Sequence, residues 1–109
     1  MQTISMSEFH AALQQAPHDP SVAFIDVRTP DEYREEHIEG VTNIPLDQLL
    51  TRRAELANKK TVYIHCRSGV RSRHAATLLA SLHEGATVFC NVEGGIAAWA
   101  AAGLPTVSA

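Results

Sequence analysis

Cysteine is scarce in this sequence of 109 residues, which contains only Cys66 and Cys90. Two cysteines are too few for a disulfide framework. The absence of a Cys-x-x-Cys pair and of a histidine-rich cluster argues against a metal site. We therefore expect two reduced thiols, and we expect neither a metal nor another cofactor.

Long apolar runs are also absent, because no stretch approaches the ~18 consecutive apolar residues that a membrane span needs. The first ten residues, MQTISMSEFH, lack the charged and apolar regions of a secretory signal. We therefore expect a cytoplasmic protein with no membrane partner. A length of 109 residues suits one domain, which we expect to span residues 1–109.

Aromatic residues make up only 6% of the chain, and the net charge is -3. Residues 19–47 hold eight acidic residues and two arginines, a net charge of -6. Residues 52–73 hold seven basic residues and one acidic residue, a net charge of +6. Few aromatic side chains and a negative net charge argue against nucleic acid as a partner. The basic segment predicts a local positive field around Cys66.

Strand-like and helix-like segments alternate along the chain. Runs of strand-forming residues predict strands at VAFIDV (22–27), VTNIP (41–45), VYIHC (62–66) and TVFCNV (87–92). Helices are predicted after Ser5, after Thr29, among the leucines of residues 46–56, from Ser72 to Leu82 and across GIAAWAAA (95–102). This alternation predicts an α/β fold with a central, mainly parallel sheet and helices on both faces.

The helix boundaries carry capping signals. Ser5 and Glu8 have the spacing of a capping box, and Pro17 is expected to stop the helix that they begin. The next helix begins at Thr29 with a proline in its first turn, and Gly40 is expected to end it. These two predicted helices therefore each have a start signal and an expected stop.

Ligands of parallel α/β sheets bind beyond the carboxyl ends of the strands. The turns after Val27, Cys66 and Val92 should therefore lie together at one edge of the sheet. Gly94 and Gly95 are expected to form a tight turn into the last helix. Of the three turns, the one after Cys66 has the residues most suited to chemistry.

Cys66 lies where a strand gives way to a helix. The intervening RSGVR segment must curl with its amide hydrogens inward and the helix N-terminus toward the sulfur, an arrangement that stabilises anions. Such a setting lowers the pKa of a thiol from its usual ~8.5, and Arg67 and Arg71 can each offer a planar fork of donors to an oxyanion. We expect Cys66 to be a thiolate nucleophile. The alternative is a small buried residue at a strand end, with arginines that only solvate the loop.

Three separated motifs occur in this order: FIDVRTPDEYREEHIEGVTNIP (24–45), HCRSGVRS (65–72) and NVEGGIAAWAAAGLP (91–105). They resemble the rhodanese homology domain in its single-domain form, over nearly the whole chain. The resemblance implies a rhodanese-like fold with a five-stranded sheet. It also implies a sulfurtransferase that moves the outer sulfur of thiosulfate, or of a similar small anionic donor, to cyanide or a thiol, including a thiol on a partner protein.

The resemblance also assigns the site residues. Cys66 is the nucleophile that holds the sulfur as a persulfide. The residues that bind the donor or the persulfide are Arg67, Ser68, Gly69, Val70 and Arg71. The loop of six residues that begins at Cys66 has the length that the family uses. Its two arginines suit the thiosulfate dianion better than a neutral donor or a monoanion.

Two alternatives to sulfur transfer share this fold. Cysteine-dependent phosphatases and arsenate reductases use His-Cys-x5-Arg, which would require an arginine at the position of Ser72. The loop is one residue short for that chemistry. The other alternative is a non-catalytic module that carries sulfur or regulates a partner, although such modules usually lose the cysteine that this chain retains.

Other polar and reactive residues are expected to be structural. Asp26 should hold neighbouring backbone, Arg28 should pair with an acid, and Glu32 should cap its helix at the third position. His65 lies within a strand and is expected to be a core histidine with its hydrogen bonds satisfied. Cys90 lies inside a strand and is expected to pack in the core.

Overall fold

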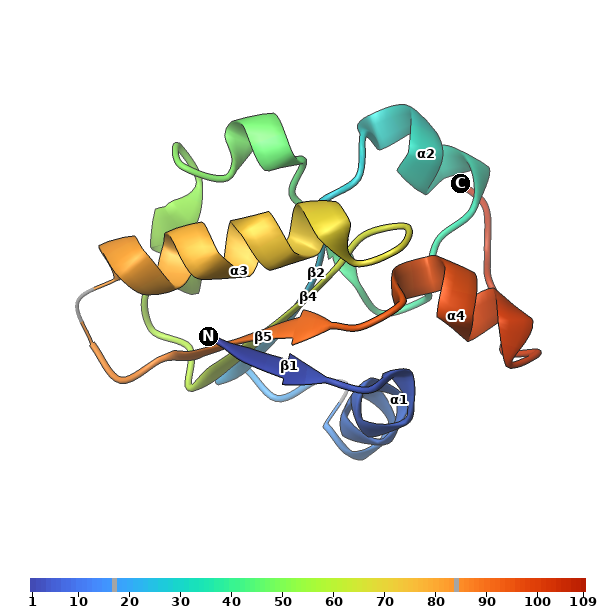
Figure 1. Ribbon diagram of the computed structural model, residues 1–109, viewed down its shortest axis with the longest axis horizontal. Coiled ribbons are helices and arrows are strands. Elements are labelled where there is room, and N and C mark those ends of the chain that lie inside the picture. The colour runs from blue at the N-terminus through green and yellow to red at the C-terminus, as the bar shows by residue number, and fades with distance from the viewer. Residues whose placement is uncertain (17, 84) are drawn as a thin grey trace.

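A parallel sheet forms the centre of the molecule in the computed structural model, which describes residues 1–16, 18–83 and 85–109 (Figure 1). Its five strands are β1 (Gln2–Ile4), β2 (Val22–Asp26), β3 (Thr42–Asn43), β4 (Thr61–His65) and β5 (Val88–Val92). They lie in the order β1-β5-β4-β2-β3, and every neighbouring pair is parallel. The α/β fold and the parallel sheet are therefore confirmed.

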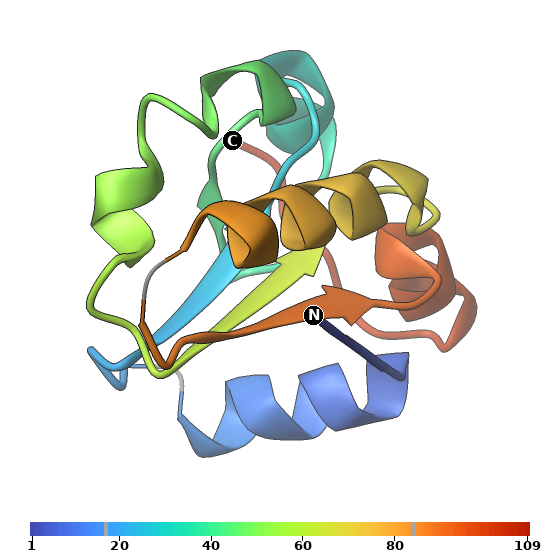
Figure 2. The ribbon, with the colours of Figure 1, turned by 60° about the vertical axis from the view of Figure 1, so that its left-hand side comes forward.

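Helices cover both faces of this sheet, as Figure 2 shows. The helices are α1 (Met6–Gln15), α2 (Pro30–Glu35), α3 (Val70–Leu82) and α4 (Gly95–Ala101), and the 3-10 turns are η1 (Leu46–Gln48) and η2 (Arg53–Leu56). Helix α3 and the 3-10 turns enclose one core cluster, and α1 and α4 enclose the other. Among the described residues, no helix has the length and apolar character needed to cross a membrane.

The alternation of side chains along the strands places the two cysteines on opposite faces. Ile64 and Cys66 belong to the core cluster under α3, whereas Tyr63 packs against the cluster under α1 and α4. Along β5, Cys90 points to the same side as Val92, which belongs to the α1 and α4 cluster. The sheet therefore separates the two thiols.

Helix α1 begins as its capping box predicts. The amide of Glu8 donates to Oγ of Ser5 at 3.1 Å, and the amide of Ser5 donates to Oε1 of Glu8 at 3.2 Å. Phe9 is fully buried on the inner side of the helix. The helix ends at Gln15, while Pro17, which is expected to stop it, lies outside the described residues.

One strand was not predicted, and one predicted helix boundary is wrong. The N-terminal strand β1 has no apolar run to reveal it, and it forms by pairing with β5 at the sheet edge. Helix α2 ends at Glu35 well before Gly40, because His37 pairs with Val107 in an antiparallel bridge that requires extended backbone. Both errors reflect pairing between distant parts of the chain.

The leucine-rich segment and the start of α3 also differ from expectation. The leucines of residues 46–56 form two short 3-10 turns and no α-helix, with Leu49 and Leu56 buried and Leu50 exposed. Helix α3 begins at Val70, two residues before Ser72. Its early start brings part of the predicted cysteine loop into the first turn of the helix.

Candidate active site

The turns after β2, β4 and β5 meet at one edge of the sheet, as predicted. The amide of Val27 donates to the carbonyl of His65 at 3.1 Å, which ties the first turn to the end of β4. The amide of Ile96 donates to the carbonyl of Cys66 at 2.9 Å, which ties the third turn to the second. Cys66 thus lies at the centre of the carboxyl edge.

The sulfur of Cys66 is surrounded by hydrogen-bond donors. The amides of Gly69 and Ser72 donate to Sγ at 3.1 and 3.4 Å, and the thiol can donate to Oγ of Ser72 at 3.3 Å. Burial, with only 1% of Cys66 exposed, raises the pKa of the thiol. Hydrogen bonds from Ser72, Gly69 and Ser68 outweigh burial, so the pKa lies below its usual value. This geometry supports the predicted thiolate.

A buried relay continues from the sulfur through Ser72. The Ser72 hydroxyl donates to Oδ1 of Asn91 on β5 at 2.6 Å, and both side chains are buried. When Cys66 loses its proton, the Ser72 hydroxyl can turn its hydrogen to the sulfur. Sequence reasoning did not assign a functional role to either residue, although a polar Asn91 within an apolar strand was a usable signal.

The N-terminus of α4 holds the cysteine loop in place. The amides of Ile96 and Ala97 donate to the carbonyls of Cys66 and Arg67 at 2.9 and 3.0 Å. This approach requires glycine at Gly95, where φ is +53° and an added Cβ would lie 2.2 Å from the carbonyl oxygen of Cys66. The predicted tight turn is therefore also a clamp on the cysteine.

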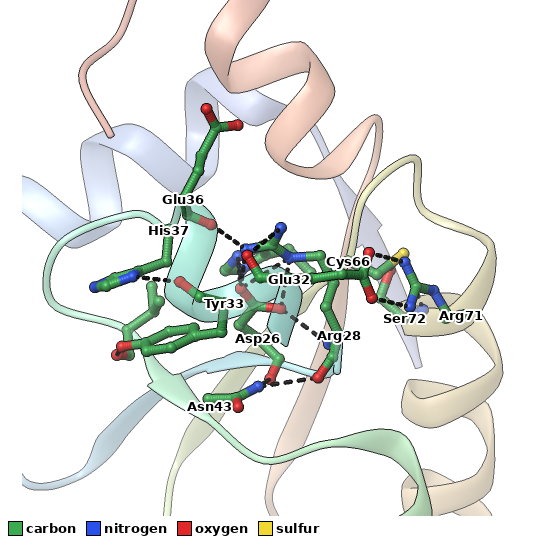
Figure 3. Close-up of polar contacts among 12 residues, drawn as sticks. Asp26, Arg28, Glu32, Tyr33, Glu36, His37, Asn43, Cys66, Arg71 and Ser72 are labelled. Carbon is green, nitrogen blue, oxygen red and sulfur yellow. Dashed lines mark hydrogen bonds and ion pairs between the residues drawn. The ribbon is translucent and has the colours of Figure 1, made fainter. Parts of the chain in front are cut away.

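The two loop arginines are placed differently. Arg71 forms two hydrogen bonds with Glu32 of α2, at 2.7 and 2.9 Å (Figure 3). The pairing with Arg71 lowers the pKa of Glu32 to about 2. Arg67 is exposed and makes no side-chain hydrogen bond among the described residues. The Arg71 fork expected to face a donor is thus occupied by a carboxylate, which sequence reasoning assigned only to the helix cap.

The remaining predicted loop residues differ in exposure. Ser68 is exposed, and its amide contributes to lowering the pKa of Cys66. Val70 is 66% exposed and begins α3. Gly69 adopts φ +105° as the N-cap of α3, which aims its amide at the sulfur. The structure therefore directs the amides of Ser68 and Gly69 at the sulfur. The exposed Ser68 and Val70 form the rim of the loop, and Arg71 is paired with Glu32.

Comparison with known proteins decides the family, because residues 8–102 match the model of the rhodanese-like domain. The chain belongs to the rhodanese family. It is 39% identical over 99 residues to the uncharacterized protein YqhL of Bacillus subtilis, a match that covers 91% of this chain and 72% of YqhL. It is 35% identical over 95 residues to a sulfurtransferase of Allochromatium vinosum, with 87% of each chain covered.

A solved structure shows the same rhodanese fold. The rhodanese-related protein of Thermoplasma volcanium is similar with a TM-score of 0.82 at 27% identity, and the match covers 98% of each chain. The resemblance seen in the sequence is confirmed, including the five-stranded sheet. This chain is therefore a rhodanese-like domain of the sulfurtransferase family.

Below the rhodanese loop, Asp26 organises a buried ion pair. Its carboxylate accepts hydrogen bonds from the amide and the guanidinium of Arg28, the shortest at 2.8 Å, and Arg28 also donates to the carbonyl of Glu36 at 2.7 Å. Burial raises the pKa of Asp26, but contacts with His65 and Arg28 outweigh it and hold that pKa far below its usual value. The expected structural role of both residues is confirmed.

His65 is fully buried, as expected, but its ring is less satisfied than expected. Its Nε2 lies 3.5 Å from Oδ2 of Asp26, at the outer limit of a hydrogen bond. Neither ring nitrogen has a well-formed hydrogen bond to the part of the chain that the structure describes. The ring of Phe9 packs beside it, with 5.5 Å between ring centroids. The apolar side of the core therefore leaves this histidine with one weak polar contact.

Cys90 takes no part in the rhodanese site. It is buried, and burial raises the pKa of its thiol. It also points to the face of the sheet opposite Cys66, so it cannot reach the sulfur of Cys66 without unfolding β5. The predicted core position is confirmed.

Proposed function

We propose that this rhodanese domain is a thiosulfate sulfurtransferase that works through a persulfide on Cys66. The observation that carries the proposal is the sulfur of Cys66, held by the inward amides of Gly69 and Ser72 at the N-terminus of α3. A thiolate is the nucleophile of such a reaction. The lowered pKa of Cys66 favours this form without a separate general base.

In the first step, the Cys66 thiolate attacks the outer sulfur of thiosulfate. A bond forms between Sγ and that sulfur, the sulfur–sulfur bond of thiosulfate breaks, and sulfite leaves with the electron pair. The exposed guanidinium of Arg67 is one cation available to the donor's sulfonate. The exposed Arg73 is another, because it lines a hollow with Ser68 and Gly69. The rim residues Ser68 and Val70 would contact the donor, and the amide of Gly69 would stabilise the negative persulfide.

In the second step, an acceptor takes the outer sulfur. Cyanide attacks it, the persulfide bond breaks, and Cys66 leaves as a thiolate while thiocyanate forms. A thiolate acceptor would react in the same way and leave as a persulfide. The exposed rim at Ser68 and Val70 would also admit a thiol on a partner protein. We place this reaction in the cytoplasm, where thiols such as those of Cys66 and Cys90 stay reduced.

The structure supports phosphatase activity less well than it supports sulfur transfer. The position where a phosphatase loop needs arginine is occupied by Ser72, which is fully buried and bonded to the sulfur and to Asn91. A guanidinium there would displace this relay. Ser72 thus stabilises the thiolate at the position where a phosphatase would need an arginine to bind the phosphoryl group.

Thiocyanate release from thiosulfate and cyanide tests the proposal. Wild type and Cys90→Ala should form thiocyanate, and Cys66→Ser should form none, because only Cys66 has a thiol at the sheet edge. Each variant keeps one of the two cysteines, so the pair forms a matched control. Hydrolysis of an aryl phosphate by wild type without thiocyanate formation would contradict the proposal.

A further inference from the structure

The ion pair between Arg71 and Glu32 joins the cysteine loop to helix α2. Arg71 lies in the first turn of α3, and both of its terminal nitrogens donate to the two oxygens of Glu32. The side chains of Arg71 and Glu32 are 35% and 26% exposed, so water screens the pair only in part. The fork formed by the two terminal nitrogens is therefore in use, and the charge of Arg71 is paired with a carboxylate.

Glu32 is itself fixed in position. Its Oε1 accepts the amide of Thr29 at 3.0 Å, and its own amide donates to Oγ of Thr29 at 3.2 Å. This capping box is a feature of α2 and is independent of the cysteine loop. An arriving anion therefore has to draw Arg71 away from a carboxylate that stays where it is.

The surroundings add to this effect. A hollow beside the loop is lined by two arginines, Arg28 and Arg67, and by three acidic residues, Glu32, Glu35 and Glu36. Arg28 is already paired with the buried Asp26. Like charges oppose the approach of a dianion more than that of a monoanion. Selection between dianionic and monoanionic donors at this side of the loop thus depends on how many arginine side chains are not paired with an acid.

Given the proposed sulfur transfer, we propose that Glu32 determines donor specificity. By occupying Arg71, Glu32 weakens the binding of the thiosulfate dianion. It does not change the binding of a persulfide donor whose reacting end carries one charge or none. Such a donor transfers its outer sulfur to Cys66 in a single displacement. The Cys66 thiolate takes the outer sulfur with its hydrogen, the donor's sulfur–sulfur bond breaks, and a thiolate leaves with the electron pair.

Glu32→Gln tests this assignment, because glutamine preserves the capping box while it removes the charge that holds Arg71. The KM for thiosulfate should fall by about three- to tenfold, since the dianion gains a guanidinium fork. The KM for 2-hydroxyethyl persulfide should stay within about twofold, because that donor carries no second charge. Glu32→Ala also frees Arg71 but removes the capping bond to Thr29, so it is a second variant only where its unfolding curve matches that of Glu32→Gln.

Glu35→Gln is the matched control. Glu35 lies on the same helix and lines the same hollow, but its side chain makes no hydrogen bond among the described residues. The exposed charge of Glu35 is screened by salt, so this variant should lower the KM for thiosulfate by less than about twofold, which measures the part of the effect that comes from the acidic surroundings alone. An equal effect of both variants, an equal shift for both donors, or a KM for thiosulfate that stays constant or rises in Glu32→Gln would each overturn the assignment.

A second readout separates this inference from the proposed function. Sulfate should protect Cys66 from alkylation by iodoacetamide, and half-protection should need about three- to tenfold less sulfate in Glu32→Gln than in wild type. This measurement requires no sulfur transfer. If wild type forms no thiocyanate but the protection still tightens, the proposed function fails and the role of Glu32 stands. Unchanged protection in Glu32→Gln would remove the role of Glu32 whatever the activity.

Discussion

At the level of single residues, the reactivity of Cys66 depends on which groups donate hydrogen bonds to its sulfur. Burial alone raises the pKa of the thiol, and the sulfur would be inert if burial prevailed. The amides of Ser72 and Gly69 donate to the sulfur, and the Ser72 hydroxyl, which accepts from the thiol, can donate to the sulfur once the thiolate forms. The hydroxyl is the contribution that mutation can remove without changing the backbone.

Ser72→Ala should raise the pKa of Cys66 and slow its alkylation at neutral pH. The variant removes the hydroxyl hydrogen bond but keeps the amide donors, so the rate of reaction with iodoacetamide at pH 7 should fall by about three- to tenfold. The midpoint of the pH–rate profile should move to higher pH. The measurement is made in a Cys90→Ala background, so that only the Cys66 thiol can react with iodoacetamide.

Asn91→Ala provides the partner experiment for Ser72. It removes the acceptor at the far end of the relay and leaves the Ser72 hydroxyl free for the sulfur. Alkylation at pH 7 should therefore be equal to wild type or faster, opposite in direction to Ser72→Ala. Slower alkylation in both variants would show that the relay only packs the loop.

At the scale of elements, the last helix positions the nucleophile as much as the loop does. Gly95 lets the α4 amides reach the carbonyls at the end of β4, and its missing side chain leaves the required space. Gly103 offers a comparison, because it also has positive φ, at +76°, but an added Cβ would meet nothing within 4 Å. The two glycines separate crowding from backbone strain.

Gly95→Ala should destabilise the fold by about 3 kcal/mol or more, because its Cβ would collide with backbone and its φ is unfavourable. Gly103→Ala should cost about 1 kcal/mol from backbone strain alone. Urea unfolding of both variants measures the difference. Equal losses would show that α4 does not press on the cysteine loop.

The sequence predicted most elements but fewer of their contacts. Capping signals at Ser5 and Thr29 placed two helix starts, because they act between residues that are close along the chain. Strand β1 and the early end of α2 depend on distant pairing partners, so no local pattern revealed them. The same reason hid the pair of Arg71 and Glu32, which are 39 residues apart. Cys66 could be identified because strand, cysteine, loop and helix are consecutive.

At the scale of the whole molecule, the buried pair of Asp26 and Arg28 links folding to pH. The pKa of Asp26 lies far below its unfolded value, and that of Glu32 is about 2. A lowered carboxyl pKa contributes stability above the unfolded pKa, near ~4, and this contribution is lost as the pH falls through the folded pKa. We expect acid to destabilise the domain below about pH 4.

Asp26→Asn should lower the free energy of unfolding at pH 7 by about 3 kcal/mol, because it leaves a buried arginine without its partner. It should also flatten the loss of stability below about pH 4, since one of the groups responsible is gone. Asp47→Asn, at an exposed aspartate, is the control and should behave like wild type. A variant curve parallel to wild type at acid pH would contradict this role of Asp26.

A sulfur atom carried on Cys66 changes the mass of the protein, so intact mass spectrometry detects it without a coupled assay. Purified protein is measured before thiosulfate, after thiosulfate, and again after cyanide, with Cys66→Ser treated in parallel. We predict a gain of about one sulfur, ~32 Da, on wild type alone, which cyanide removes as thiocyanate. If thiosulfate leaves the wild-type mass unchanged, or if Cys66→Ser gains the same mass, Cys66 does not carry the transferred sulfur.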